Sequence, residues 1–156
     1  MINATIKFQI QEKITINDEW IITVWKKILS DKNILNGVIT IIMSEDEMLR
    51  KFKLNFFNQD VLTDVIAFNL EDKGEPIEGE IYISLTRAKE NALQFEEPFE
   101  KEIARLIIHG SLHLIGYTDE TLITKREMTR MENQYLHNRI WKNIFPSKKE
   151  LINEKE

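Results

Sequence analysis

The spacing of hydrophobic and polar residues along the chain predicts alternating strands and helices. Alternating apolar and polar side chains, or short β-branched apolar runs, predict strands over 5–10, 38–43, 65–70 and 80–85. Apolar residues at helical spacing, preceded by capping or first-turn residues, predict helices over 17–32, 44–57, 86–95, 98–115 and 124–144. The order β-α-β-α-β-β-α-α-α indicates the α+β class, with a small mixed β-sheet of about four strands packed with about five helices.

Three local patterns refine this prediction. The helix over 98–115 is apolar nearly all round, which predicts that it is buried in the core. The loop over 71–79 is polar and contains two glycines and a proline, so the strands on either side are expected to pair as a long-looped hairpin. The expected helix caps are Ser44 with Glu47 as a capping box, Thr86, and Thr124 with Glu127 as a second box.

Composition narrows the class of protein. The chain has 156 residues, which predicts a single domain over 1–146 and a charged, frayed C-terminal tail over 147–156. It contains no cysteine, so a metal site would have to use His, Asp or Glu. The absence of a signal-peptide pattern and of a long apolar stretch predicts a cytoplasmic protein with no membrane contact. A net charge of −5 gives no overall attraction to nucleic acid, so RNA contact would need a local basic patch.

The segment HGSLHLIGYTD, which begins at His109, has the spacing of a metal site. His109 and His113 are four residues apart and therefore lie on one face of the expected helix. Gly116 can take a left-handed conformation that ends the helix and turns the chain back, which would bring Asp119 within reach as a third ligand. Three protein ligands with a fourth position open are typical of a catalytic zinc site. Glu120, adjacent in sequence, is the alternative third ligand.

The metzincin pattern H-E-x-x-H-x-x-G-x-x-H has the same offsets, which predicts a zincin-like metal helix in the core. Two differences change the expected chemistry. Asp119 stands in place of a third histidine, and its carboxylate favours Mn²⁺ or another harder ion more than histidine would. Gly110 stands where zinc peptidases carry their catalytic glutamate, which argues against peptide hydrolysis. The glycine either leaves room beside the metal or allows another backbone segment to approach closely.

The same segment resembles the metal motif of the YbeY family, H-G-x-L-H-L-x-G-Y-D-H. Two upstream segments are similar to that family in the same order: TDVIAF from Thr63 resembles T-D-V-L-S-F, and GEIYIS from Gly79 resembles G-D-I-x-I-S. The resemblance implies a metal-dependent, single-strand-specific endoribonuclease involved in ribosomal RNA maturation and ribosome biogenesis. It implies one divalent metal ion, with Zn²⁺ expected. The implied partners are single-stranded RNA, above all ribosomal RNA, and the ribosome or its associated proteins.

The implied reaction is metal-assisted phosphodiester hydrolysis, with either water or the RNA's own 2′-hydroxyl as the attacking group. No residue is identified as the general base. Asp119 departs from the family motif, because it takes the place of the last histidine. The family usually has an arginine, assigned to the RNA phosphate, shortly before the T-D segment, and the corresponding residue here is Phe57. The cations considered as replacements are Arg50, Lys53 and Arg87.

Several polar and basic residues are further candidates. Thr63, Asp64 and Ser84 are expected to line the cleft or orient the metal ligands, unless they serve only as turn and cap residues. Tyr117 either offers its hydroxyl near the metal or packs behind the glycine turn. Two basic clusters on predicted helices either contact RNA or form solvated faces: Arg50, Lys51 and Lys53, and Lys125, Arg126 and Arg130.

Two other functions stay open at this point. The altered third ligand and the missing arginine fit a non-catalytic ribosome-assembly factor that contains a structural metal. A zincin-type metallopeptidase is the weaker alternative, because Gly110 replaces the glutamate that such an enzyme needs.

Overall fold

Four strands form one mixed sheet in the order β1-β2-β4-β3. The structure is a computed structural model that describes residues 1–12, 14–72 and 76–146. The strands are β1 (Ile2–Phe8), β2 (Gly37–Ser44), β3 (Val65–Asn69) and β4 (Ile77–Ser84). β1, β2 and β4 run parallel, whereas β3 pairs antiparallel with β4 and lies at one edge of the sheet. The antiparallel pairing predicted for β3 and β4 is therefore confirmed.

Five α-helices and one 3₁₀ helix complete the described chain. They are α1 (Asp18–Asp31), α2 (Asp46–Phe57), α3 (Leu85–Gln94), α4 (Phe99–Leu114), α5 (Leu122–Leu136) and the 3₁₀ helix η1 (His137–Asn143). Strands and helices follow each other in the predicted order, and the α+β class is confirmed. The tail expected over 147–156 lies outside the described residues.

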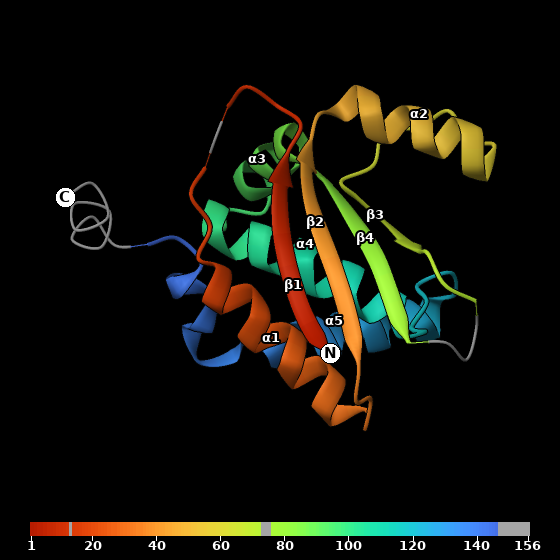
Figure 1. Ribbon diagram of the computed structural model, residues 1–156. Helices are drawn as coiled ribbons and strands as arrows, with labels where there is room; N and C mark the ends of the chain where they lie inside the picture. Colours follow the sequence, from red (N-terminus) through yellow and green to blue (C-terminus); the bar gives the residue numbers. More distant parts are fainter. Residues whose placement is uncertain (13, 73–75, 147–156) are drawn as a thin grey trace.

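The two faces of the sheet are covered by different helices. Neighbouring residues of a strand point to opposite faces, and Ile81 and Tyr82 of β4 show the division. The Ile81 side chain meets α4 at Gly110, so α4 covers one face. The Tyr82 ring lies 4.7 Å from the Phe52 ring of α2, so α2 covers part of the other face. Figure 1 shows α4 crossing behind the strands and α2 set apart from the other helices.

α4 is buried in the core, as its apolar surface predicted. Ile103, Leu106 and Ile108 of this helix are completely removed from solvent. Burial of each such side chain stabilises the fold by about 1.5–3 kcal/mol. The side chains that α4 presents to solvent therefore project from a firmly held helix.

Two of the predicted helix caps are wrong because neighbouring residues already have the geometry that a cap needs. α2 begins after Glu45 and has no side-chain cap bond, and the Ser44 hydroxyl donates to the Gln9 side chain instead. α3 is capped by Ser84 rather than by Thr86. Ser84 is the last residue of β4 and has an extended backbone, so the helix can begin directly after it.

The start and the end of α5 also differ from the prediction. Its capping box joins Thr121 and Thr124, not Thr124 and Glu127. Thr121 has the extended backbone of a cap, whereas Thr124 already lies inside the helix. The helix ends at Leu136, and the chain continues as the tighter η1 instead of as one long helix.

Gly110 allows α4 to lie close to β4. A Cβ atom added at this residue would come within 2.6 Å of the Ile81 Cγ2 atom, which is far inside van der Waals contact. Of the two interpretations of this glycine, the close approach is therefore the one that the structure supports. The glycine faces the sheet rather than leaving space beside the histidines.

Gly110→Val is expected to destabilise the fold, because three added carbon atoms must displace Ile81 or the helix itself. Overpacking of this kind costs roughly 1–3 kcal/mol. For a chain of this size, each kcal/mol lowers the melting temperature by roughly 2–4 °C. Thermal unfolding followed by circular dichroism measures the change. Ser111→Ala, in the same helix, adds no atoms and is the control; equal melting temperatures for the two variants would contradict the close contact.

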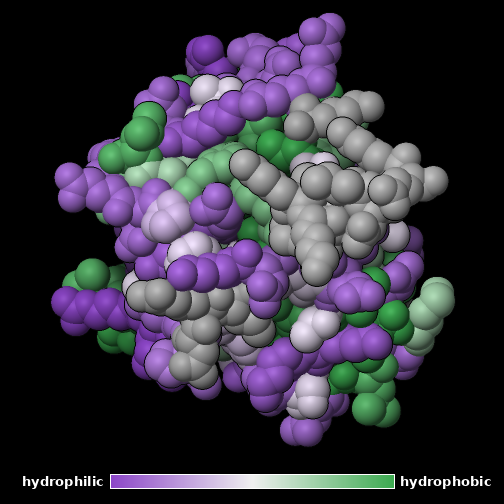
Figure 2. All heavy atoms as spheres, turned by 90° about the vertical axis from the view of Figure 1, so that its left-hand side faces the viewer, coloured by the Kyte–Doolittle hydropathy of each residue, from purple (hydrophilic) through white to green (hydrophobic). Residues whose placement is uncertain are grey.

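Hydrophobic side chains are gathered between the sheet and the helices, where they form one core cluster. Hydrophilic side chains cover much of the face seen from the left-hand side of Figure 1, and hydrophobic ones show between them and at the edges of the view (Figure 2). No helix in the described part of the chain has the length and apolar character needed to cross a membrane.

Candidate metal centre

The end of α4 and the segment after it bring His109, His113 and Asp119 together. The two histidines lie one turn apart on α4. Gly116 then has a φ of +109°, in the positive range predicted for it, which glycine adopts without strain. Its N–H donates to the His113 carbonyl at 3.1 Å and closes the end of the helix. The returning chain places the Asp119 carboxylate beside both imidazole rings.

The spacing of these three side chains fits the ligands of one small cation. The Nε2 atoms of His109 and His113 are 3.0 Å apart. The Asp119 carboxylate oxygens lie 3.5 Å from the His109 Nε2 atom and 3.6 Å from the His113 Nε2 atom. Ligand atoms around a tetrahedral zinc ion lie ~3.3 Å from one another, given bonds of ~2.0–2.1 Å. His109, His113 and Asp119 could therefore hold one metal ion together.

Glu132 of α5 holds the His109 ring from behind. The His109 Nδ1 atom lies 2.5 Å from the Glu132 Oε1 atom, and the Glu132 side chain is only 6% exposed. A carboxylate at Nδ1 accepts a hydrogen bond from the N–H of that nitrogen, which leaves the Nε2 lone pair directed toward His113 and Asp119. Sequence reasoning missed Glu132. The available signal was a charged residue within the apolar stripe formed by Met128 and Leu136.

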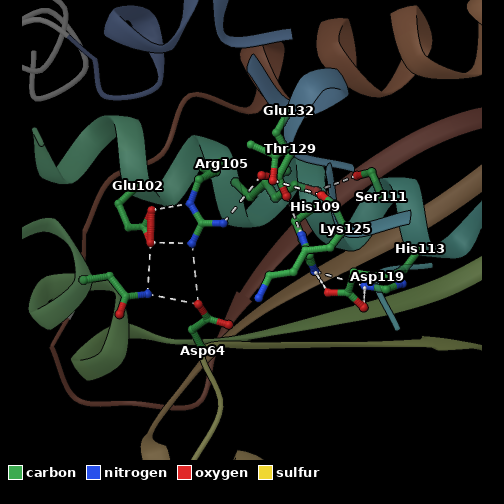
Figure 3. A network of polar contacts seen from close by, with 12 residues as sticks. Asp64, Glu102, Arg105, His109, Ser111, His113, Asp119, Lys125, Thr129 and Glu132 are labelled. Carbon is green, nitrogen blue, oxygen red and sulfur yellow. Dashed lines mark hydrogen bonds and ion pairs between the residues drawn. The ribbon is translucent and has the colours of Figure 1, made fainter. Parts of the chain in front are cut away.

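Arg105 connects Glu132 to a second group of polar side chains (Figure 3). Its guanidinium donates two bonds to Glu102, at 2.6 and 2.7 Å. It also lies 3.7 Å from Glu132 and 3.5 Å from Asp64. Burial disfavours the charged guanidinium, but the bonds with Glu102 and the nearby carboxylates outweigh it and raise the pKa of Arg105. Sequence reasoning missed Arg105 too, although it lies one turn before His109 on α4.

Asp64 lies at the far end of this network. The Asn91 amide donates to the Asp64 carboxylate at 2.9 Å and to Glu102 at 3.0 Å. Asp64 is thereby linked to His109 through Arg105 and Glu132. Asp64 and His109 therefore belong to one network of polar contacts, and the role predicted for Asp64 beside a metal stays a prediction.

The His113 imidazole is biased toward its neutral form. Burial is the largest cause and the neighbouring His109 ring the next, and together they lower the pKa of His113 against the opposing effect of Asp119. A neutral imidazole is the form that binds a metal ion. The side chain is still 30% exposed, so it can be reached from solvent.

A groove of about 670 Å³ runs beside the three side chains. Thr63, Asp64, His109, His113 and Asp119 all line it, as does Glu120, which is not part of the three-residue cluster. The opposite lining includes β3, the edge strand of the sheet. The groove therefore combines polar ligands with a strand edge and apolar side chains.

Two predicted site residues, Ser84 and Tyr117, lie outside the groove. The Ser84 hydroxyl is buried, donates to Asp46 at 2.6 Å and caps α3, so Ser84 has the structural role of a cap. The Tyr117 ring packs against the core cluster, with the Lys32 ammonium 4.7 Å from its centre. Neither residue lines the groove beside the histidines.

The basic residues considered for RNA contact also separate in the structure. Lys53 and Lys125 line the groove, and so does Phe57. Arg50 forms an ion pair with Asp60 at 2.6 Å and does not line the groove. Arg87 also forms an ion pair within the protein, because its guanidinium donates to Asp46 at 3.2 Å. Of the three cations considered as replacements for the family's arginine, Lys53 is the one placed in the groove.

Comparisons with known proteins bear on the identity of the chain. Residues 3–139 match the family model described as Endoribonuclease YbeY. A relative with that name from Amoebophilus asiaticus is 41% identical over 122 residues, which cover 77% of this chain and 83% of the relative. Another from Flavobacterium psychrophilum is 40% identical over 134 residues, which cover 86% of this chain and 91% of the relative.

A solved structure has a similar fold. The solution structure of a Thermotoga maritima protein aligns with a TM-score of 0.56 at 27% identity, over 90% of this chain and 89% of that one. The resemblance seen in the HGSLHLIGYTD segment and the two upstream segments is therefore confirmed over most of the chain. This chain belongs to the YbeY endoribonuclease family.

Proposed function

We propose that this chain is a metal-dependent endoribonuclease that cleaves single-stranded RNA in the cytoplasm. Its proposed substrate is ribosomal RNA, and its proposed role is RNA maturation during ribosome biogenesis, in contact with the ribosome or its associated proteins. Family membership supports the nuclease activity. The observation that carries the metal dependence is the cluster of His109, His113 and Asp119 in an open groove.

Zn²⁺ is the proposed ion, because two imidazoles and one carboxylate are a donor set that zinc accepts. A divalent ion held there would supply Lewis-acid chemistry, by lowering the pKa of a water molecule or polarising a phosphoryl oxygen. The surrounding residues have separate roles. Glu132 holds His109 in one tautomer and orientation, and Arg105 partly neutralises the buried Glu132 carboxylate.

The shape of the site favours a single strand. His109 is only 15% exposed and lies within the groove, so a substrate must enter the groove to reach it. A flexible strand can splay its backbone and bases into such a site, whereas a duplex presents its phosphates on a rigid convex surface. Phe57, Val65 and Leu114 provide apolar lining that unstacked bases can contact.

The test compares one RNA sequence as a single strand and as a duplex, each incubated with purified protein loaded with one equivalent of Zn²⁺. We expect cleavage of the single strand, little cleavage of the duplex, and no cleavage after chelation. Metal content determined by mass spectrometry on the same sample establishes which ion is present. An intact single strand in the presence of stoichiometric metal would overturn the proposal.

A non-catalytic ribosome-assembly factor is the second candidate, and Phe57 in place of the family's arginine is the observation that favours it. In that case the metal would join the end of α4 to the segment carrying Asp119. Chelation would then lower the melting temperature sharply, and ribosome association would survive ligand substitutions that spare the fold. RNA cleavage that depends on His113 would exclude this candidate.

A further inference from the structure

Two lysines reach the groove without a carboxylate partner. Lys53 of α2 and Lys125 of α5 both contribute to its lining. Within residues 1–12, 14–72 and 76–146, neither ammonium group forms an ion pair. Arg105, the third cation of the lining, is instead committed to Glu102. The two lysines are therefore the cations of the groove that remain available to an anion from outside.

An aromatic ring holds Lys53 in place. The Lys53 ammonium lies 4.7 Å from the centre of the Phe57 ring, one helical turn further along α2. The Phe57 ring is in turn stacked on Phe68 of β3, with ring centres 6.3 Å apart and planes 26° apart. A cation–π contact positions an ammonium group without neutralising its charge. The Phe57 ring thus holds the Lys53 ammonium in a defined position on the groove.

Lys125 approaches the groove from a different helix. It lies near the start of α5, where the capping box of Thr121 and Thr124 fixes the backbone. Its own N–H donates to the Thr121 carbonyl at 2.9 Å. In Figure 3 the Lys125 side chain extends toward the space between Asp64 and the histidine pair.

Three carboxylates line the groove, and two of them, Asp64 and Asp119, face partners inside the protein, while Glu120 is the third. Asp64 accepts from Asn91 and faces Arg105, and Asp119 faces the two histidines. Arg105 partly offsets the charge of Asp64, and a divalent ion held by the histidines would offset that of Asp119. Lys53 and Lys125 therefore supply local positive charge at the groove, which a chain with a net charge of −5 needs in order to attract a polyanion.

We infer that Lys53 and Lys125 bind backbone phosphates of a single-stranded nucleic acid that lies in the groove beside His109 and His113. The inference rests on the proposed function for the identity of the ligand. It adds the residues that hold the strand, and it assigns Phe57 the role of positioning the Lys53 ammonium.

The test measures the salt dependence of binding, which reports the number of phosphates neutralised. The probe is a short, fluorescently labelled 2′-O-methyl oligouridylate, whose anisotropy is followed with zinc-loaded protein at several salt concentrations. The logarithm of the association constant falls linearly with the logarithm of the salt concentration. Each lost phosphate contact on a single strand makes this slope less steep by about 0.7. Lys53→Gln and Lys125→Gln are each expected to reduce the slope by about 0.7, and the double variant by about 1.4.

Lys51→Gln and Arg126→Gln are the matched controls, because they remove one positive charge from the same two helices at residues that do not line the groove. Their slopes are expected to stay close to that of the wild-type protein. The inference is overturned if the double variant keeps the wild-type slope, if the controls lose as much as the groove variants, or if the wild-type protein does not bind the probe.

Cleavage of unmodified RNA by the same preparations separates this inference from the proposed function. Lysine-dependent binding without cleavage by the wild-type protein would support the inference and overturn the proposed nuclease. Cleavage by the wild-type protein with unchanged slopes in the lysine variants would overturn the inference alone.

Discussion

His113→Ala is expected to abolish metal binding and RNA cleavage together. The substitution removes one of the three candidate ligand side chains, and the Nε2 atom that it deletes lies 3.0 Å from the Nε2 atom of His109. A catalytic metal contributes several kcal/mol to transition-state stabilisation, so its loss should slow cleavage by at least ~10³-fold. Metal content and the initial rate of cleavage of a single-stranded RNA are measured on the same preparation.

His137→Ala is the matched control. His137 is the third histidine of the chain, is exposed at the end of α5, and does not line the groove. This variant should retain wild-type metal content and cleavage rate. Full metal occupancy in His113→Ala would show that the ion is held elsewhere, and the candidate metal centre would then be wrong.

Glu132→Gln is expected to weaken metal binding without unfolding the protein. The amide keeps the size of the carboxylate and can still accept a bond from the His109 Nδ1 atom, but it removes the buried negative charge. Loss of such an outer partner of a ligating histidine typically costs about 10–100-fold in metal affinity. Competition with a chromogenic zinc chelator measures the affinity.

Glu127→Gln, on an exposed part of the same helix, controls for the change in net charge. Circular dichroism shows whether both variants stay folded. Equal zinc affinities for Glu132→Gln and Glu127→Gln would mean that the Glu132 carboxylate does not influence the ligand, despite its short contact with His109.

Local patterns predicted most of the fold. The helical spacing of apolar residues identified α4 as a buried helix, and the strand patterns placed β2, β3 and β4 close to their observed limits. Helix caps were predicted less well, because a cap depends on the backbone conformation that its residue takes in the folded chain. Ser84 illustrates this point: the end of β4 made it the cap of α3, although Thr86 has an equally suitable side chain.

The three-residue cluster could be predicted from the sequence, because all of its geometry is local. Helix periodicity places His109 and His113 on one face, and the conformational freedom of Gly116 allows the turn that returns Asp119 to them. None of these relationships needs a residue from a distant part of the chain.

The residues that surround the cluster could not be predicted in this way, because they come from distant parts of the chain. Glu132 follows His109 by 23 residues and meets it because α5 packs against α4. Asp64 comes from a segment far earlier in the chain and reaches the groove because β3 forms the sheet edge beside α4. Lys53 reaches it because α2 packs on the sheet, with the Phe57 ring stacked on Phe68 of β3. Such contacts depend on how whole elements pack, which no local spacing encodes. For the same reason, Ser84 and Tyr117 lie outside the groove, although both belong to the motif segments of the sequence.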